Sequence, residues 1–523
     1  MLMIELRSYL QNAWISGSGK TATLVNPSTE EPVATSSTEG IDFKAALSFA
    51  RERGGPALRK MSFKDRGEMI RAMSRAIHAH RDELMTLALQ NGGNTRSDAK
   101  FDIDGASGTL AAYADLAATL GDKSHLIDGE GQQLGRSARL FGVHVWTPRE
   151  GVAVHINAFN FPAWGLAEKA AVALLAGMPV VTKPATSTAV VSHRIVEIFV
   201  AEKILPEGAL SFIAGSAGDL LDHVGGQDVL AFTGAGSTGA MLRGGKSALV
   251  NSVRVNVEAD SLNAAALGPD ADVDGELMNL FIGDVVRDMT QKTGQKCTAI
   301  RRVYVPKEKV EAVLEKIRER LGDVKVGDPT NESVTMGPVA TKQQLVDVRA
   351  GIEKLMSCAK IVSGSTGDVE PMGGSQSGAQ KGKGFFISPV LLHGASPDPS
   401  DAVHNHEVFG PVVTVMPYDG SAEHVARLIA GGGGGLVSSI YSDDKSFVKH
   451  SVLAIAPFHG RVTIGSSKIV GQTIPPGTVL PQLVHGGPGR AGSGEELGGK
   501  RGLAFYMQRT ALQGDRALLE SFL

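Results

Sequence analysis

Residues 230–239 read Leu-Ala-Phe-Thr-Gly-Ala-Gly-Ser-Thr-Gly, an apolar run that ends in a glycine-rich turn. From Gly234 to Gly239 the turn fits the spacing GxGxxG, which alone is a weak signal because such turns are common in α/β proteins. A turn of this kind presents backbone N–H groups at the start of a helix, where hydrogen bonding and the helix dipole both favour a pyrophosphate. The stretch predicts a strand, a phosphate-binding turn and a helix.

The same alternation of strand-like and helix-like patterns extends over residues 151–265. Apolar runs end at Lys183 and at Ala214, and helical patterns cover 166–176 and 188–204. This alternation predicts an α/β fold with a parallel sheet covered by helices. In such sheets ligands bind beyond the carboxyl ends of the strands. The residues expected there are Lys183, Thr233, Gly234, Ala235 and Gly239.

Two further strand ends carry groups that can do chemistry. Val253, Val255 and Val257 alternate with polar residues, and this run stops at the carboxylate of Glu258. A second run, over residues 152–156, leads into Asn160, which places a neutral amide donor just past the end of a strand. A base and a hydrogen-bond donor are therefore expected at one edge of the sheet.

A thiol, Cys297, lies among small and polar residues in the stretch Thr293-Gly294-Gln295-Lys296-Cys297-Thr298-Ala299. Free cysteine is usually a small buried hydrophobe, and the heptapeptide alone favours that interpretation. The upstream carboxylate and amide favour a catalytic cysteine instead, because nucleophile, base and oxyanion donor are then all present. A helix expected over 276–293 ends before Cys297, so a helix dipole does not activate the thiol.

Taken together, Asn160-Phe161-Pro162, the strand-ending Glu258 and Gly294-Gln295-Lys296-Cys297 resemble the aldehyde dehydrogenase superfamily over nearly the whole chain. The resemblance implies that Cys297 is the nucleophile, that Glu258 activates the hydrolytic water and that the Asn160 amide stabilises the oxyanion. By matching position, Lys169 and Glu496 resemble a supporting proton relay. The alternative for these two is a surface or interdomain ion pair.

The resemblance also implies the domain organisation, a Rossmann-like cofactor domain with an α/β catalytic domain and a small β extension. We expect the cofactor domain over 1–130 and 151–265, the catalytic domain over 266–470, and the extension over 131–150 and 500–523. The alternating stretch 138–146 is a strand or hairpin by its periodicity. In the family such an extension joins subunits, so a homodimer or a larger homo-oligomer is expected.

A nicotinamide cofactor follows from the same resemblance. Glu407-Val408-Phe409-Gly410-Pro411 resembles the family's motif, in which the Glu holds the nicotinamide ribose and the Phe packs the ring. Phe159 is expected to contact the cofactor, and Ala235 stands where many relatives have a serine, so one hydroxyl contact is missing. NAD-preferring relatives commonly have a Glu at the position of Thr186. Because a carboxylate there would repel a 2′-phosphate, Thr186 beside Lys183 predicts NADP, with use of NAD as well the alternative.

The substrate is narrowed by two departures from the commonest family pattern. Residues 467–494 form a long Pro- and Gly-rich segment, and Glu258 begins Glu-Ala-Asp-Ser-Leu-Asn where most relatives have Glu-Leu-Gly-Gly-Lys. Both resemble the ring-cleavage aldehyde dehydrogenases of aromatic degradation, including benzoate breakdown, which imply a CoA thioester semialdehyde as substrate. Two alternatives stay open: a CoA-acylating dehydrogenase, although these generally lack the carboxylate of Glu258, and a non-catalytic binding protein on the same fold.

Composition excludes several other functions. The 523 residues are 42% hydrophobic and 20% charged with a net charge of -3, which gives no broad field for nucleic acid. The sequence contains no apolar run of about 18 residues for a membrane span. Two cysteines, Cys297 and Cys358, argue against a disulfide framework and for a reducing compartment such as the cytoplasm. With two thiols and no trusted spacing among 14 histidines, no metal site is expected.

Overall fold

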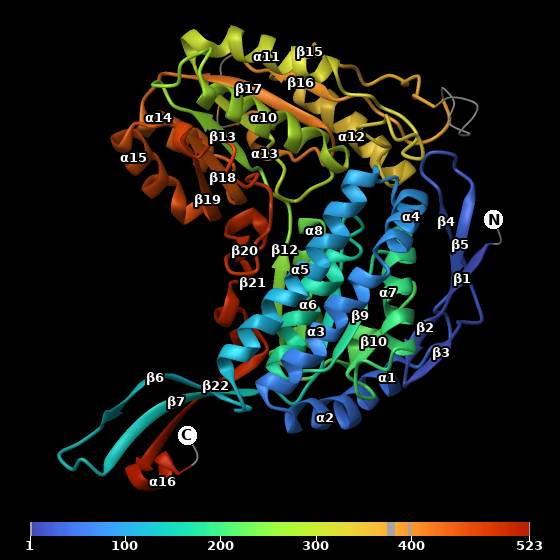
Figure 1. Ribbon diagram of the computed structural model, residues 1–523, viewed down its shortest axis with the longest axis vertical. Helices are drawn as coiled ribbons and strands as arrows, with labels where there is room; N and C mark the ends of the chain where they lie inside the picture. The colour runs from blue at the N-terminus through green and yellow to red at the C-terminus, as the bar shows by residue number, and fades with distance from the viewer. Residues whose placement is uncertain (1–2, 374–381, 396–397, 399, 522–523) are drawn as a thin grey trace.

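A computed structural model describes residues 3–373, 382–395, 398 and 400–521. The described chain contains two seven-stranded sheets with helices around them and a three-stranded sheet that extends away from the body (Figure 1). This arrangement confirms the predicted α/β fold with parallel sheets. No helix within the described ranges is long and apolar enough to cross a membrane.

The first large sheet has the order β12-β11-β8-β9-β10-β2-β3, and its first five strands are parallel. Helices connect β8 to β9, β9 to β10 and β11 to β12, as parallel neighbours in βαβ units require. The strands are β2 Ser8–Leu10, β3 Ala13–Ile15, β8 Ala153–Ile156, β9 Val180–Lys183, β10 Leu210–Phe212, β11 Val229–Thr233 and β12 Arg254–Glu258. The helices in this part of the chain are α1 Phe43–Phe49, α2 Gly55–Lys60, α3 Phe63–Ala79, α4 Arg81–Gly92, α5 Arg96–Leu120, α6 Trp164–Ala176, α7 Ala189–Ala201, α8 Gly236–Arg243 and α9 Lys246–Val250.

The second large sheet has the order β15-β16-β17-β14-β13-β18-β19 and is parallel except for β15. Its strands are β13 Ala264–Leu267, β14 Arg302–Pro306, β15 Lys360–Ser363, β16 Val390–His393, β17 Val412–Tyr418, β18 Gly435–Tyr441 and β19 His459–Gly465. The helices of this part are α10 Glu276–Thr290, α11 Val310–Gly322, α12 Lys342–Leu355, α13 Ala402–Asn405, α14 Ala422–Ala430 and α15 Lys445–Ile455.

The remaining strands form small sheets. The extending sheet has the order β22-β7-β6, with β6 Leu126–Gln133, β7 Leu140–Pro148 and β22 Met507–Asp515, followed by α16 Arg516–Glu520. Two other sheets contain β1 Ile4–Leu6, β4 Ala22–Val25 and β5 Pro32–Ser36, and the hairpin of β20 Val484–Gly487 and β21 Gly494–Leu497. The proposed domain limits at 130 and 265 thus fall inside β6 and β13, and the division into domains stays a prediction.

Two helices end earlier than their patterns predict. The helix predicted over 188–204 is α7, which ends at Ala201 because Lys203 has a left-handed backbone, with φ of 52°. The helix predicted over 276–293 is α10, which ends at Thr290. A short 3₁₀ turn, η4 Gln291–Gly294, follows it, with Lys292 and Thr293 at φ of 53° and 55°. This turn re-aims the chain toward Cys297.

The five glycines 431–435, to which the sequence assigns no role, lie where three segments meet at close range. A Cβ on Gly432 would lie 2.2 Å from Arg302 Nη2, and one on Gly434, at φ of 126°, would lie 2.1 Å from the Pro488 carbonyl oxygen. Arg302 in turn donates to the carbonyls of Leu428 and Ile429 at the end of α14. The glycines let α14, Arg302 and the turn after β20 pack together. The Gly- and Ser-rich segment predicted as a surface loop, 363–384, lies partly outside the described residues.

Candidate active site

Cys297, Glu258 and His485 meet at the carboxyl edge of the first sheet. Glu258 is the last residue of β12, and His485 is the second residue of β20. His485 Nε2 lies 3.0 Å from Glu258 Oε1 and 3.9 Å from Cys297 Sγ. One thiol, one imidazole and one carboxylate therefore share a site in which the histidine and glutamate side chains are at most 4% exposed.

The turn before Cys297 is fixed by close packing. Gly294 has φ of 68°, and a Cβ there would lie 2.1 Å from the Gly410 carbonyl oxygen, so only glycine fits without movement. The Gln295 side chain accepts from the Ala340 backbone N–H and donates to the Lys292 carbonyl. These contacts hold the strained turn and so determine where the thiol points.

Asn160 lies where an oxyanion donor is needed. Its Nδ2 donates to the Gln295 carbonyl at 2.9 Å, and an amide group has a second N–H to offer. Asn160 and Cys297 line the same two cavities, one of which also contains Phe101, Phe161 and Trp164. The structure thus brings together the three residues that the sequence proposes as nucleophile, base and oxyanion donor.

Glu258 is held as a carboxylate. Burial would raise its pKa, but His485 and then Lys169 outweigh burial and lower the pKa to about 2. Its other oxygen, Oε2, accepts from the Thr233 hydroxyl at 3.2 Å. Thr233, expected to contact the cofactor, therefore also orients Glu258.

The surroundings of Cys297 disfavour its ionised form, in contrast to those of Glu258. Burial raises its pKa, and the neighbouring Glu258 carboxylate raises it further. A thiol is a useful nucleophile only as the thiolate. The site therefore needs a positive charge near the sulfur.

Behind Glu258 lies a buried ionic cluster. Lys169 Nζ lies 3.1 Å from Glu168 Oε1 and 3.1 Å from Glu496 Oε2. The carboxylates of Glu168, Glu258 and Glu496 offer oxygens within 4.8 Å of one another. Burial raises the pKa of Glu168 to about 7. Lys169 and Glu496 thus form an interior ion pair beside the base, and Glu168, which no sequence pattern marks, joins them.

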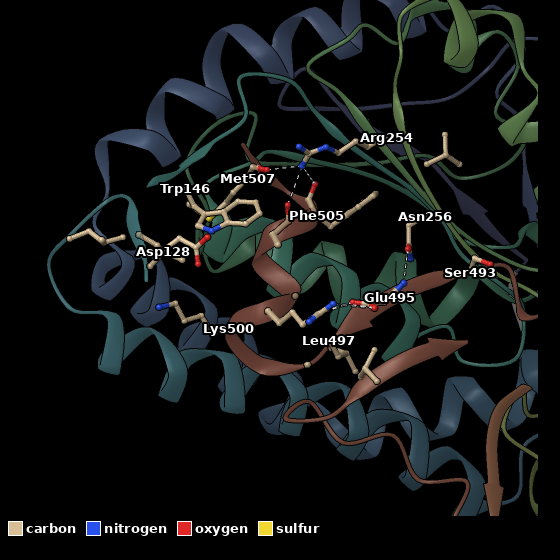
Figure 2. Close-up of a pocket in the computed structure, with 18 residues that line it drawn as sticks. Asp128, Trp146, Arg254, Asn256, Ser493, Glu495, Leu497, Lys500, Phe505 and Met507 are labelled. Atoms are coloured by element: carbon tan, nitrogen blue, oxygen red, sulfur yellow. Dashed lines mark hydrogen bonds and ion pairs between the residues drawn. The ribbon is translucent and has the colours of Figure 1, made fainter. Parts of the chain in front are cut away.

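A cavity of about 900 Å³ is lined by residues of β12, of β21 and of the C-terminal segment (Figure 2). Its lining includes Asn256, whose Nδ2 donates to Glu496 Oε1 and whose Oδ1 accepts from the Glu495 backbone. Figure 2 also shows Arg254, which donates to the carbonyls of Phe505 and Met507 and ties β12 to the C-terminal segment. The buried ionic cluster is thus connected through Asn256 to this cavity.

Two cavities suit a dinucleotide. One, of about 590 Å³, contains Phe159, Gly234, Ala235, Glu407 and Phe409 together with Cys297. Glu407 Oε2 accepts from the Ser261 backbone at 3.0 Å, whereas Oε1 accepts no hydrogen bond and lies 3.5 Å from Arg301 Nε in an ion pair. Burial raises the pKa of Glu407 to about 7. An unsatisfied carboxylate oxygen in this cavity fits the hydroxyls of a ribose.

The second cavity, of about 850 Å³, contains Lys183 and Thr186. Lys183 Nζ donates to the Pro184 carbonyl at 3.0 Å, and burial lowers its pKa.

In the first cavity the rings of Phe159 and Phe409 meet edge to face, with their centroids 5.8 Å apart. The predicted cofactor residues thus divide between two cavities, except that Gly239 is buried in α8 with its Cα facing Val257.

The glycine-rich turn differs from the expected phosphate cradle in one respect. The Gly236 N–H at the start of α8 donates to Asp260 Oδ1 at 2.9 Å. A carboxylate of the chain itself thus occupies one donor that a pyrophosphate would use. Asp260 belongs to the stretch in which this sequence departs from the commonest family pattern.

A protein-family model described as the aldehyde dehydrogenase family matches residues 14–512. The chain belongs to the aldehyde dehydrogenase family. It is 42% identical over 485 residues to the 3,4-dehydroadipyl-CoA semialdehyde dehydrogenase of Aromatoleum evansii, covering 93% of each chain. It is 26% identical to the glutarate-semialdehyde dehydrogenase of Pseudomonas putida, covering 97% of each.

Among solved structures, this aldehyde dehydrogenase resembles a betaine aldehyde dehydrogenase of Staphylococcus aureus in complex with NAD+. The TM-score is 0.83 with 22% identity, over 98% of each chain. It also resembles an NADP-dependent enzyme of E. coli, with a TM-score of 0.84 and 22% identity, over 98% of each chain. At these identities the two structures support the aldehyde dehydrogenase fold.

His485 is the site residue that sequence reasoning passed over. It lies in the 467–494 segment, which drew attention only for its length and composition. The available signal was the single histidine in this Pro- and Gly-rich stretch, in a sequence that offers no other partner for the thiol.

Proposed function

We propose that this aldehyde dehydrogenase oxidises a CoA-linked semialdehyde to the acid through a covalent thioester on Cys297. The observation that carries the proposal is the meeting of Cys297, Glu258 and Asn160 at one cavity. The 42% identity to a 3,4-dehydroadipyl-CoA semialdehyde dehydrogenase over 93% of both chains supports that substrate or a similar one.

In the first step the Cys297 thiolate adds to the aldehyde carbon. The carbonyl oxygen becomes an oxyanion, which the free N–H of Asn160 and the Cys297 backbone N–H stabilise. Loss of one such donor typically costs about 2.7 to 4 kcal/mol of barrier. When bound, a nicotinamide cofactor accepts the hydride from the tetrahedral carbon, which leaves a thioester on Cys297.

In the second step Glu258 takes a proton from water, and the hydroxide attacks the thioester carbon. The C–S bond breaks, the acid leaves, and Cys297 is regenerated. The proton passes from Glu258 to the cluster of Lys169, Glu168 and Glu496, in which the two glutamates have oxygens within 4.8 Å of the Glu258 carboxylate. Glu168, with a pKa of about 7, matches a group that exchanges protons near neutral pH.

The cofactor is proposed to be NADP. Glu407 and Phe409 would hold the nicotinamide end, and Lys183 and Thr186 the adenosine end, where a hydroxyl and an ammonium suit a 2′-phosphate. Thr186→Glu should raise the KM for NADP much more than that for NAD, because only NADP brings a second charge to that place. Equal loss for both cofactors, or a wild type that prefers NAD, would refute this assignment.

The experiment for the main proposal follows reduction of NADP at 340 nm with a CoA-linked semialdehyde. Wild type should turn over, whereas Cys297→Ala should show no oxidation and still bind NADPH with unchanged fluorescence enhancement. Appreciable turnover by Cys297→Ala would end the covalent mechanism. Mass spectrometry of the product separates the free acid from a second CoA thioester, which the CoA-acylating alternative would form. A wild type without turnover on any aldehyde would favour the non-catalytic alternative.

We further propose a homo-oligomer joined through the β22-β7-β6 sheet, and a cytoplasmic location. Cys297 and Cys358 are both free thiols in the structure, which suits a reducing compartment.

A further inference from the structure

We propose that His485 is a catalytic residue that makes the Cys297 thiolate possible: the Glu258–His485 pair takes up the thiol proton and holds it as an imidazolium beside the sulfur. This inference rests on the proposed covalent function of Cys297. The S–H bond breaks, the electron pair stays on sulfur, and the pair gains one proton. No further reactant is needed.

The geometry supports this role directly. His485 Nε2 lies within hydrogen-bonding distance of both the sulfur, at 3.9 Å, and the Glu258 carboxylate, at 3.0 Å. A nucleophile beside a base that is itself held by a third group is the general arrangement of an activated thiol. The imidazole touches two anions at once, so one positive charge on His485 offsets both.

Without that charge the site would oppose ionisation. Glu258 is buried and Cys297 is half-buried beside it, and two anions in contact in such a site repel each other strongly. Lys169 supplies a positive charge, but it is shared with Glu168 and Glu496, which it contacts at 3.1 Å each. Within the part of the chain that the structure describes, His485 is the basic side chain recorded in contact with the sulfur.

The charges that face His485 come from every element around it. They are Glu258 on β12, Cys297 after η4, Glu168 and Lys169 on α6, and Glu496 on β21. Burial lowers the imidazole pKa, but Glu258 and the other two carboxylates outweigh burial and raise it. The carboxylates around His485 thus favour the imidazolium form that follows transfer of the thiol proton.

His485 is placed by the β20–β21 hairpin. Val484 to Gly487 pair with Leu497 to Gly494, and the partner of His485 in this register is Glu496. The same hairpin thus delivers the imidazole to the thiol side of Glu258 and the Glu496 carboxylate to the ionic cluster behind it. Gly486, at φ of 141°, would place a Cβ 2.0 Å from the Gly494 carbonyl oxygen, so the tight pairing needs glycine next to His485.

The test is the pH profile of Cys297 alkylation by iodoacetamide, measured without aldehyde or cofactor. Every protein carries Cys358→Ser, which removes the other thiol. EDTA is present because thiol, imidazole and carboxylate within 4.8 Å of one another can also chelate a metal. Wild type should react with an inflection well below the usual thiol pKa of about 8.5.

In His485→Gln the side-chain amide can still donate to Glu258 but cannot hold a charge. The inflection should move up by at least about one pH unit, which lowers the rate constant at pH 7 about tenfold. The two profiles should meet at high pH, where every thiol is ionised. The matched control is His459→Gln, a buried histidine on β19 that contacts Ser438 and Ile455 instead of the thiol, and its profile should equal that of wild type.

Two results would overturn the proposal: a wild-type inflection at or above about 8.5, or His485→Gln and wild-type profiles that superimpose. The first needs no variant and therefore stands even if His485→Gln does not fold. Because no aldehyde is present, the outcome is separate from the proposed function. Oxidation by Cys297→Ala would refute the covalent mechanism while leaving a shifted alkylation profile intact.

Discussion

At the scale of single residues, Glu258 combines two features that pull in opposite directions. A strongly ionised carboxylate is always available to take a proton, but its low proton affinity makes it a weak base. His485 and Lys169 keep it ionised, and Thr233 aims it. Proton removal from Glu258 to the neighbouring cluster is therefore as important as proton uptake.

Glu258→Gln should separate the two chemical steps. An amide cannot take a proton from water, whereas His485 remains beside the thiol to take up its proton, so acylation should slow less than thioester hydrolysis, which should fall by about 10²- to 10⁴-fold. Stopped-flow absorbance should show a burst of NADPH followed by a slow steady state, with the acyl-enzyme visible by intact mass. If burst and steady state fell equally, Glu258 would act before hydride transfer.

The raised pKa of Glu407 predicts that cofactor binding depends on pH. Burial raises its pKa to about 7, so the carboxylate form prevails above that pH and the acid form below it. Because the carboxylate is the better acceptor for ribose hydroxyls, the Kd for NADPH should rise as the pH falls from 8 to 6. Fluorescence titration measures the Kd without turnover, so proton uptake during hydrolysis does not affect the result.

Two variants control that measurement. Glu407→Gln should bind more weakly and lose the pH dependence, because its amide does not titrate. Glu168→Gln should keep it, although Glu168 also has a pKa near 7. A wild-type Kd that stays constant between pH 6 and 8 would contradict the role of Glu407.

Local patterns in the sequence marked three of the site residues, and family resemblance added Lys169 and Glu496. Glu258 and Asn160 follow alternating apolar runs, and Cys297 stands out among small polar neighbours. His485 and Glu168 have no such mark, because their importance comes from tertiary contacts between β20, α6 and β12. The roles assigned from resemblance stay predictions until the variants above are measured.

At the scale of elements, the 467–494 segment consists of two parts with different surroundings. The second part enters the β20–β21 hairpin and carries His485. The first part reaches the thiol cavity through Gly477 and Val479 and is anchored by the Thr298 hydroxyl, which donates to the Gly477 carbonyl. Replacing the whole segment would remove the imidazole as well, so the two parts must be tested separately.

Residues 469–474 are the place to test the CoA preference. Ile469, Val470 and Ile474 are exposed apolar side chains at 37%, 38% and 51%. Replacing 469–474 by Gly-Ser should lower kcat/KM for a CoA-linked semialdehyde by about tenfold or more, because remote binding energy is lost. Turnover of propanal should change little, since that substrate has no remote group. Equal loss for both substrates would mean that the segment is structural.

The sequence predicted which segments form helices and strands but not how these elements are arranged. Apolar periodicity marked the strands of the first sheet, and glycine marked the end of α6 at Gly177, with φ of 90°. Periodicity could not reveal the left-handed residues that end α10 early, because Lys292 and Thr293 are held there by packing against other parts of the chain. The strand order also depends on long-range pairing that no local pattern records.

At the scale of the whole molecule, the β22-β7-β6 sheet stands away from the body with two open edges (Figure 1). Its pairing joins residues far apart in the chain, such as Thr510 with Val145, and only family resemblance made it predictable. A small sheet with exposed edges is marginal by itself. Leu134, Leu140 and Leu518 at or near its outer end are 49%, 46% and 68% exposed.

These exposed side chains predict that a second copy of the chain covers the sheet. Light scattering after size exclusion should give at least twice 54.7 kDa for wild type. The double variant Leu140→Asp, Leu518→Asp should shift toward one chain mass, because burying two unpaired carboxylates in an interface is costly. Val346→Asp, at a similarly exposed site (52%) on α12, should keep the wild-type mass. A wild type that elutes as a single chain, or a double variant with unchanged mass, would show that this sheet does not join subunits.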